Sequence, residues 1–421
     1  MQKTISYHFR NYSLAVVLLS IVSIFAINGI SFSSTEEADN RYRAVRAMGM
    51  GNVFSAVADD GDAFYYNPAG LSDIRKVRVD IQPLRLIPTR DLYEESKDMG
   101  DLIDDMDKLS KSSDPLEDPA LKNERIRIAD KLERMANENL GLDIAAPVRI
   151  IIPFHIGNYG AALGFNAGVW SDSKIQIKKR GLNWSDPVKN IMDDEVFYKI
   201  MAEAHYGLAS AIKFPVPTTP IALSFGFYAR NIHRNIMTDE DDMLKVEYIL
   251  NPKGPDGIKG TDDDFENRYF DPNDPLDMIN KGKGYSLDAG VMASVSESLK
   301  LALTFQNLIG KIDYKEIDDY TMKKYIGTSA SLNASKFIGI SSISDIILTA
   351  GMDDINDKES YQLGLEAIWK LGFLSLSGRI GNNKGYLTMG AGLQLFFLDI
   401  DYAFFGDEAT DWHAISLNLA F

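Results

Sequence analysis

The chain of 421 residues contains no cysteine, only five histidines and no excess of positive charge. The absence of cysteine excludes disulfide scaffolds, cysteine-ligated zinc, iron–sulfur clusters and thiol nucleophiles. With 44 basic and 60 acidic residues, the net charge is −16, so no basic surface for nucleic acid is expected and no nucleic-acid partner is predicted. Because 45% of the residues are hydrophobic, the chain is too apolar to be disordered. Composition leaves an enzyme, a binding protein and a membrane barrel open.

Long hydrophobic runs are also scarce. The run from Leu14 to Ile27 is shorter than the roughly 20 residues that a transmembrane helix needs. Lys3 and Arg10 precede it, and it is followed by the small residues Gly29, Ser31, Ser33 and Ser34, which is the pattern of a secretory signal peptide. We therefore predict a signal peptide over 1–34 and export of the chain; an uncleaved anchor or a buried helix is the alternative.

What the chain does contain is a repeated alternation of apolar with polar or small residues. Between Tyr361 and Trp369, and again between Leu299 and Phe305, every second residue is apolar. Side chains on a strand point alternately to opposite faces, so each segment has one apolar face. We predict fourteen strands, near 77–88, 147–156, 160–179, 196–214, 220–236, 284–297, 299–309, 323–334, 345–354, 359–370, 373–381, 385–397, 398–406 and 412–421.

The second face of these strands carries charged and histidine side chains at strand centres, as in a wet or plugged barrel lumen. Connections between the strands also alternate in length: 89–146, 180–195 and 237–283 are long, whereas 157–159 and 215–219 are short. Long external loops and short periplasmic turns are typical of outer-membrane barrels. The predicted lumen-lining residues are Arg149, His155, Lys199, Glu203, His205, Arg230, Asp288, Glu366, Arg379, Asp399 and Asp401.

These observations favour an all-β fold over 76–421: a transmembrane antiparallel up-and-down β-barrel of about 14 strands, with outer-membrane lipid around it. A closed barrel leaves no unpaired edge strand in the bilayer. The alternative is a soluble β-sandwich, which would show the same alternation with its apolar face turned inward. The barrel reading places the chain in the cell outer membrane of a diderm bacterium.

Residues 35–75 precede the first strand and do not alternate. They contain Arg46-Ala47-Met48-Gly49-Met50-Gly51, then Asp59-Asp60, then Tyr65-Tyr66-Asn67-Pro68-Ala69-Gly70-Leu71. Residues 41–75, together with 345–421, resemble the FadL-like outer-membrane transport barrel superfamily, and within it the PorV/PorQ and TraF-like branch most closely. The resemblance implies that 35–75 forms a hatch inside a fourteen-stranded barrel. The hatch positions it implies are Gly49, Gly51, Asn52, Asp59, Asp60, Asn67, Pro68, Ala69, Gly70 and Leu71. The alternative is a tight turn that begins the first strand.

Two insertions fall in the predicted external loops. Apolar residues at helical spacing predict a helical insertion over 91–146, whose apolar stripes pack on the barrel mouth or on each other, or else cover a ligand or the membrane surface. The acidic loop 237–283 gathers Asp256, Asp262 and Asp264 among glycine turns. Calcium accepts such oxygen ligands, but the spacing is not that of an EF-hand, so a solvated loop is the favoured alternative. No other cofactor is expected.

No enzyme is predicted, because the chain lacks nucleophile motifs and phosphate-binding glycine loops. The resemblance implies passage of hydrophobic or poorly soluble small molecules across the outer membrane. The charged lumen face differs from this expectation, because a channel for apolar molecules does not require charged side chains. The alternative is a PorV-like protein-interaction or secretion-shuttle barrel that binds an exported protein.

Overall fold

The computed structural model describes residues 42–90, 120, 123, 126–128, 139–156, 159–178, 195–238, 244–245, 279–315, 320–338, 344–357, 360–406 and 411–421. The predicted signal peptide 1–34 and the calcium candidates Asp256, Asp262 and Asp264 lie outside these residues. So does most of the predicted helical insertion. Within the described part of the chain, no helix is both long enough and apolar enough to cross a bilayer.

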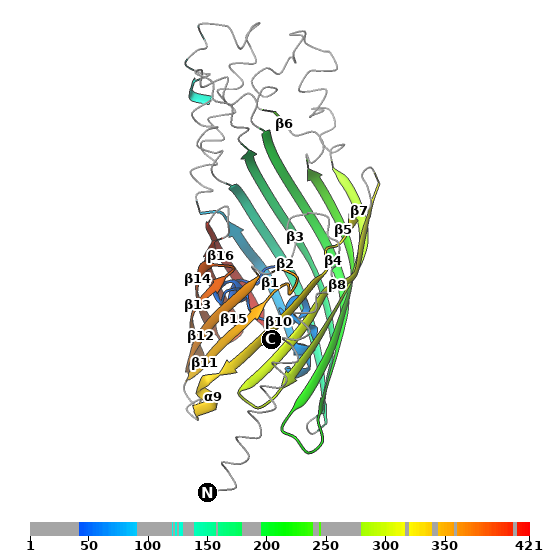
Figure 1. Ribbon diagram of the computed structural model, residues 1–421, viewed down its shortest axis with the longest axis vertical. Helices are drawn as coiled ribbons and strands as arrows, with labels where there is room; N and C mark the ends of the chain where they lie inside the picture. The colour runs from blue at the N-terminus through cyan, green and yellow to red at the C-terminus, as the bar shows by residue number, and fades with distance from the viewer. Residues whose placement is uncertain are drawn as a thin grey trace.

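The described strands form one antiparallel sheet that closes on itself (Figure 1). Its sixteen strands include two of only two residues, β6 and β9, which pair with β4 and β8 outside the ring, so fourteen strands make up the barrel wall. Pairing of β1 with β16 and of β8 with β10 closes the ring. The predicted fold class is confirmed. The strands are β1 (Arg78–Pro88), β2 (Asn139–Ile156), β3 (Tyr159–Lys178), β4 (Glu195–Pro215), β5 (Ala222–Thr238), β6 (Leu244–Lys245), β7 (Asn280–Ser294), β8 (Leu299–Tyr314), β9 (Tyr320–Thr321), β10 (Tyr325–Asn333), β11 (Ser344–Met352), β12 (Tyr361–Leu371), β13 (Leu374–Asn383), β14 (Tyr386–Leu395), β15 (Leu398–Gly406) and β16 (Asp411–Ala420).

The wall is taller on one side than on the other. Strands β2, β3, β4, β5, β7 and β8 have 15 to 21 residues, whereas β1 and β10 to β16 have 9 to 11. A tilted strand of about 9–11 residues already spans a bilayer, so the longer strands extend beyond it. In Figure 1 these longer strands rise toward the upper end of the barrel. We call this the long-loop end, and the opposite end, with the β4–β5 turn and helix α9 (Ala334–Ile338), the short-turn end.

The two faces of the wall differ as the alternation predicts. On β4, Tyr206, Leu208 and Ile212 point outward and are about half exposed or more, while Glu203 and His205 on the other face are buried. Large apolar side chains with this exposure also occur on β3, β5, β12 and β14. Such a surface is unfavourable in water, and each exposed large side chain contributes on the order of 1.5–3 kcal/mol when lipid covers it. The outward face is therefore the lipid-facing surface.

Two predicted boundaries are wrong. β2 begins at Asn139 rather than at 147, so the C-terminal part of the predicted helical insertion 91–146 is strand. Pro147 suggested a break in the pattern because proline cannot donate a ladder hydrogen bond. The predicted acidic loop 237–283 is also too wide, because β5 ends at Thr238 and β7 begins at Asn280. Gly282 and Gly284 hid the start of β7, since glycines give no alternation.

The lipid-facing surface can be tested on β14. Met389 points outward and is 45% exposed, whereas Gln394 lines the lumen. We expect Met389→Arg to cost about 2–4 kcal/mol if Met389 lies near the bilayer midplane, while Gln394→Arg folds normally. Folding yield in lipid vesicles, read from heat-modifiable migration on gels, measures the difference. Equal yields for the two variants would contradict the orientation of β14.

Candidate functional site

Residues 42–74 fill the lumen, and we call them the plug. They include helix α2 (Val45–Gly49), helix α3 (Ala63–Tyr66) and the 3-10 helix η1 (Pro68–Asp73). η1 packs against β3, β4, β5 and β7, and α2 packs against β14 and β15, on the other side of the ring. Figure 1 shows the plug inside the shorter part of the barrel. Phe54, Phe64 and Leu71 are fully buried, so the plug has its own apolar core.

The Asn67-Pro68-Ala69 segment of the plug touches the backbone of the wall. Asn67 donates from Nδ2 to the Ser55 carbonyl (2.9 Å) and accepts the Ala69 N–H at Oδ1 (3.1 Å), which fixes the turn. A Cβ atom on Gly290 would lie 1.9 Å from Oδ1 of Asn67, and one on Gly226 would lie 2.3 Å from the Ala69 nitrogen. Only glycine fits at these two wall positions, so the wall sequence is adapted to the plug.

A second close contact lies on the opposite side of the ring. Gly51 has φ +70° and donates its N–H to Oγ1 of Thr388 (2.9 Å), while the Thr388 hydroxyl donates to the Gly49 carbonyl (3.3 Å). A Cβ atom on Gly49 would come within 3.0 Å of the Gly390 backbone. The Gly-x-Gly pair of the sequence motif therefore brings the plug backbone against β14.

Charged groups also join the plug to the wall. Arg46 donates to both carboxylate oxygens of Glu366 on β12 (3.1 and 2.8 Å) and to Asp59 and Asp60 within the plug (2.8 and 3.0 Å). Glu366 is fully buried and also accepts from Arg379 (2.8 Å). Burial alone would lower the pKa of Arg46, but the three carboxylates outweigh it and raise that pKa well above its ordinary value. Arg46 therefore stays positively charged in its contact with Glu366.

On another side of the plug, Asp62 pairs with Arg149 of β2 at 2.8 Å. Burial raises the pKa of Asp62, Arg149 lowers it, and Asp60 and Asp80 raise it again, which places it at about 6 instead of 3.8. The carboxyl is thus charged near neutral pH and becomes neutral in mildly acidic solution. This ion pair therefore responds to pH in the mildly acidic range.

A third ionic contact lies at the end of η1. Asp73 accepts from Lys213 of β4 (2.6 Å) and from Lys300 of β8 (2.7 Å). Burial by itself would raise the pKa of Asp73, but the two ammonium groups outweigh it and lower that pKa below its ordinary value. Asp73 therefore stays ionised, and it ties the last residues of the plug to two strands of the wall.

A buried polar network connects the plug with β3, β4 and β5. The Tyr65 hydroxyl lies 2.9 Å from Nε2 of His205 and also accepts from Nδ2 of Asn166 (2.9 Å). Nδ1 of His205 is 3.5 Å from Glu203, which in turn accepts two hydrogen bonds from Arg234 (3.1 and 2.7 Å). The histidine is thus part of a buried network that joins the plug to the wall.

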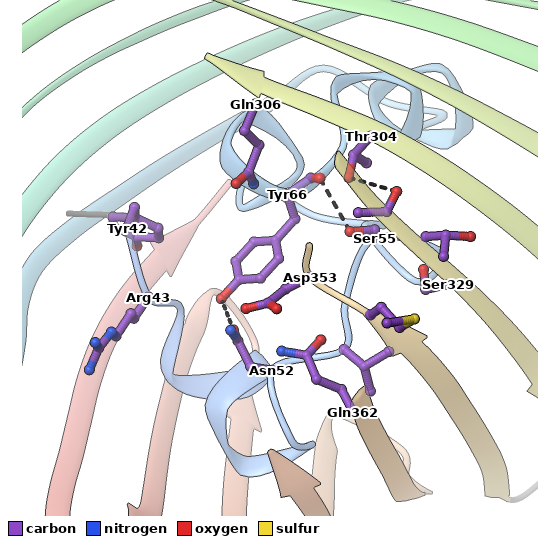
Figure 2. A pocket seen from close by; sticks show the side chains of 14 residues that line it. Tyr42, Arg43, Asn52, Ser55, Tyr66, Thr304, Gln306, Ser329, Asp353 and Gln362 are labelled. Carbon is purple, nitrogen blue, oxygen red and sulfur yellow. Dashed lines mark hydrogen bonds between the residues drawn. The ribbon is translucent and has the colours of Figure 1, made fainter. Parts of the chain in front are cut away.

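Two polar cavities border the plug. The larger, of about 380 Å³, opens at the short-turn end and is lined by charged residues including Arg46, Asp62, Arg149, Glu366 and Asp399; we call it the vestibule. The smaller, of about 40 Å³, lies between the plug and the inner faces of β8, β10, β11 and β12. Figure 2 shows its lining side chains. We call it the seam cavity. Its lining is mostly neutral and hydrogen-bonding: Tyr42, Arg43, Asn52, Val53, Ser55, Tyr66, Thr304, Gln306, Gly327, Thr328, Ser329, Met352, Asp353 and Gln362.

A third cavity, of about 590 Å³, lies in the wall and is mainly apolar; we call it the wall cavity. Its outward-facing lining comes from β3, β4, β5, β7 and β8 and comprises Phe165, Tyr206, Leu208, Ala229, Asn231, Tyr285, Leu287 and Ile309. Arg230 and Ser286, from the inward face of β5 and β7, also line it, beside Gly207. Gly207 and Ala229 contribute no bulky side chain to this part of the wall.

The structure places every predicted hatch residue in the plug and every predicted lumen residue on the inward face. Asn52 accepts from the Tyr66 hydroxyl (2.7 Å), and Gly70 packs against Ala58. Wall contacts with the plug are made by Arg149, His155, His205 and Glu366, of which His155 lies 3.3 Å from the Ser72 carbonyl. Lys199 is buried on the inward face of β4. The remaining lumen residues bond within the wall or line the vestibule: Glu203, Arg230, Asp288, Arg379, Asp399 and Asp401.

Sequence reasoning missed Tyr42, Asp62 and Asp73 as contact residues. Asp62 and Asp73 flank the recognised motif, so their acidic type next to it was an available signal. Tyr42 stands alone before the motif and carries no such signal; the Tyr65 ring stacks on it at 4.0 Å between centroids. Only the fold brings these side chains to the wall.

Comparison with known proteins gives one family match, over residues 64–227, to the family described as "F plasmid transfer operon, TraF, protein". No curated protein matches significantly. The chain is similar to the Ralstonia pickettii toluene transporter TbuX (9% identity, TM-score 0.45, covering 90% of this chain and 97% of that one). It is also similar to a Pseudomonas aeruginosa FadL homologue (11%, 0.41, 89% and 97%) and to the translocator domain of the Neisseria meningitidis autotransporter NalP (11%, 0.34, 89% and 99%).

The architecture that the resemblance implied, a fourteen-stranded wall around an N-terminal segment, is confirmed. Barrels of this kind belong to bacterial outer membranes. The PorV/PorQ branch stays a prediction.

The pKa of Asp62 gives a pH prediction. Because folding raises this pKa from 3.8 to about 6, the folded protein favours the neutral carboxyl. That contribution to stability is complete at pH values below the ordinary pKa and is lost as the pH rises through about 6. Asp62→Asn has no charged form, so its unfolding free energy relative to the parent should increase between pH 4 and 7, by at most about 3 kcal/mol.

Denaturant unfolding in detergent at several pH values measures this difference. Asp59→Asn, which removes a half-exposed carboxylate from the same segment, is the matched control. A difference between Asp62→Asn and the parent that is independent of pH would contradict the assignment.

Proposed function

We propose that this chain, exported by its signal peptide 1–34, passes hydrophobic or poorly soluble small molecules across the outer membrane. The observation that carries the proposal is the apolar wall cavity beside a lumen that the plug closes. A volume of about 590 Å³ is in the range of small-molecule binding sites. Outward-facing Tyr206, Leu208 and Ile309 line it, so a molecule bound in this cavity would be in contact with membrane lipid.

The charged interior supports a route through the wall. Below the plug, an apolar molecule would meet the Arg46, Glu366 and Arg379 cluster and the other charges of the vestibule. Charged groups in such a space hold water, and an apolar solute gains nothing by replacing it. Capture at the long-loop end, followed by exit at the wall cavity, avoids these charges.

Filling the wall cavity tests this route. Ala229 points outward and lines the cavity, so Ala229→Trp should obstruct it without changing the lumen. Ala391, an outward-facing alanine on β14, lies outside the lining, and Ala391→Trp is the matched control. We expect Ala229→Trp to reduce uptake of radiolabelled toluene and palmitate by expressing cells several-fold, and the control to leave it unchanged. Parent-level uptake by folded Ala229→Trp would refute the route.

A pull-down from detergent-solubilised outer membrane addresses the alternative secretion-shuttle role. A stoichiometric protein partner, together with no uptake of either apolar compound, would replace the transport proposal with the shuttle. Co-purifying lipid without protein would leave transport as the better account.

The plug itself gives a further prediction. Deleting residues 41–66 removes no lipid-facing side chain of the described wall, so the barrel should still fold and resist heat. Planar-bilayer recordings should then show large conductance for the deletion variant and weak conductance for the parent. Replacing both Asn67 and Pro68 with Ala should give intermediate conductance, because the turn that touches Gly226 and Gly290 would loosen. Equally low conductance in the folded parent and deletion variant would mean that the plug is not the barrier.

A further inference from the structure

The side chain of Tyr42 stands between the seam cavity and the vestibule. Its ring lines the seam cavity (Figure 2). Its hydroxyl accepts from Nη2 of Arg149 (2.7 Å) and lies 3.3 Å from Oδ1 of Asp62, and both of those residues line the vestibule. Met352 and Gln362 of the seam cavity lie at the long-loop ends of β11 and β12, whereas Lys370 and Gln394 of the vestibule lie near the short-turn end, so the two cavities lie at different heights in the barrel.

Tyr42 is held firmly in this position. It is 8% exposed, its ring stacks on Tyr65 at 4.0 Å, and the Arg85 guanidinium carbon lies 4.3 Å from the ring centroid. Its hydroxyl also donates to Oε1 of Gln82 on β1 (2.7 Å). These contacts come from both the plug and the wall, so the ring is fixed while the plug stays seated.

Both cavities carry buried polar atoms that have no hydrogen-bond partner among the described residues. In the seam cavity these are Oγ of Ser329, a residue only 7% exposed, and Oε1 of Gln306. In the vestibule they are Oδ1 of Asp399 and Oδ1 of Asn418. Buried polar atoms are rarely left unsatisfied, and water supplies the missing bonds where space allows. The seam cavity, at about 40 Å³, exceeds the roughly 10–15 Å³ that one water needs.

We propose that the seam cavity and the vestibule are two halves of one path for water and small inorganic ions through the plug, and that the Tyr42 side chain closes this path. The path is separate from the wall cavity, which shares no lining residue with either half. It gives the chain a hydrophilic conduction route beside the proposed transport of hydrophobic molecules.

Three variants distinguish whether Tyr42 blocks the ion path or only stabilises the plug. Tyr42→Ala removes the ring and joins the cavities. Tyr42→Phe keeps the ring and removes only the hydroxyl. Phe54→Ala opens a space of similar size in the plug core, since Phe54 is fully buried and lines neither cavity.

Planar-bilayer recordings in potassium chloride provide the measurement. Tyr42→Ala should raise the conductance of the full chain at least about tenfold, since opening a ring-sized constriction hydrates it. Tyr42→Phe and Phe54→Ala should conduct like the parent. Conductance of Tyr42→Ala no greater than that of Phe54→Ala would overturn the proposal.

Because the chain has no cysteine, a second measurement can locate the path. In the Tyr42→Ala background, Ser329→Cys should react with a cationic methanethiosulfonate reagent, and the reaction should lower the current. Ser331 lies two residues along the same face of β10 and donates to the Ala56 carbonyl (3.2 Å), outside the seam cavity, so Ser331→Cys should stay unmodified.

If Tyr42→Ala does not fold, Ser329→Cys in the otherwise unchanged chain tests the water-filled cavity alone, with the thiol-reactive silver ion as a probe that fits a space of about 40 Å³. Reaction of this cysteine supports the proposal, and its protection overturns it. The uptake of toluene and palmitate is measured separately. Failure of the ion path therefore leaves the wall route standing, and failure of the wall route leaves the ion path standing.

Discussion

Every wall strand must satisfy its backbone hydrogen bonds within the sheet, because the lipid around it offers neither donors nor acceptors. The chain meets this constraint by pairing its last strand with its first and by pairing β8 with β10 across the short β9. Closure then creates two environments, an apolar exterior and an interior hidden from lipid. Charged side chains such as Glu203 and Arg234 occur in the strands because the second environment exists.

Inside the closed wall, the plug is seated by charge and by shape together. Arg46, Asp62 and Asp73 pair with charged residues of β12, β2 and β4, respectively. Gly226 and Gly290 let the turn at Asn67 approach the backbone of β5 and β7. Buried ion pairs add little net stability, since desolvation offsets attraction, but a displaced plug would leave unpaired charges behind. These contacts therefore fix the position of the plug in the lumen, although they add little to its stability.

Apolar and polar spaces are separated across the wall. The wall cavity, bordered by Leu208 and Ile309, faces lipid, whereas the vestibule is lined by charges such as Arg78 and Asp399. Solutes of opposite polarity thus meet different parts of the molecule. This resolves the departure noted in the sequence: a charged lumen does not oppose transport of apolar molecules if those molecules leave through the wall.

The sequence alone determined the number of wall strands and the inward face of the lumen residues that it named, because alternation is a local property of a strand. It also located the Gly49 and Asn67 motifs, although the start of β2 was hidden by Pro147 and that of β7 by Gly282 and Gly284. Tertiary structure alone decided which wall residue meets which plug residue. Arg46 and Glu366 are 320 positions apart, and Tyr42 separates two cavities whose linings come from distant strands. Such contacts depend on how the barrel closes around the plug. A local sequence pattern carries no information about that closure.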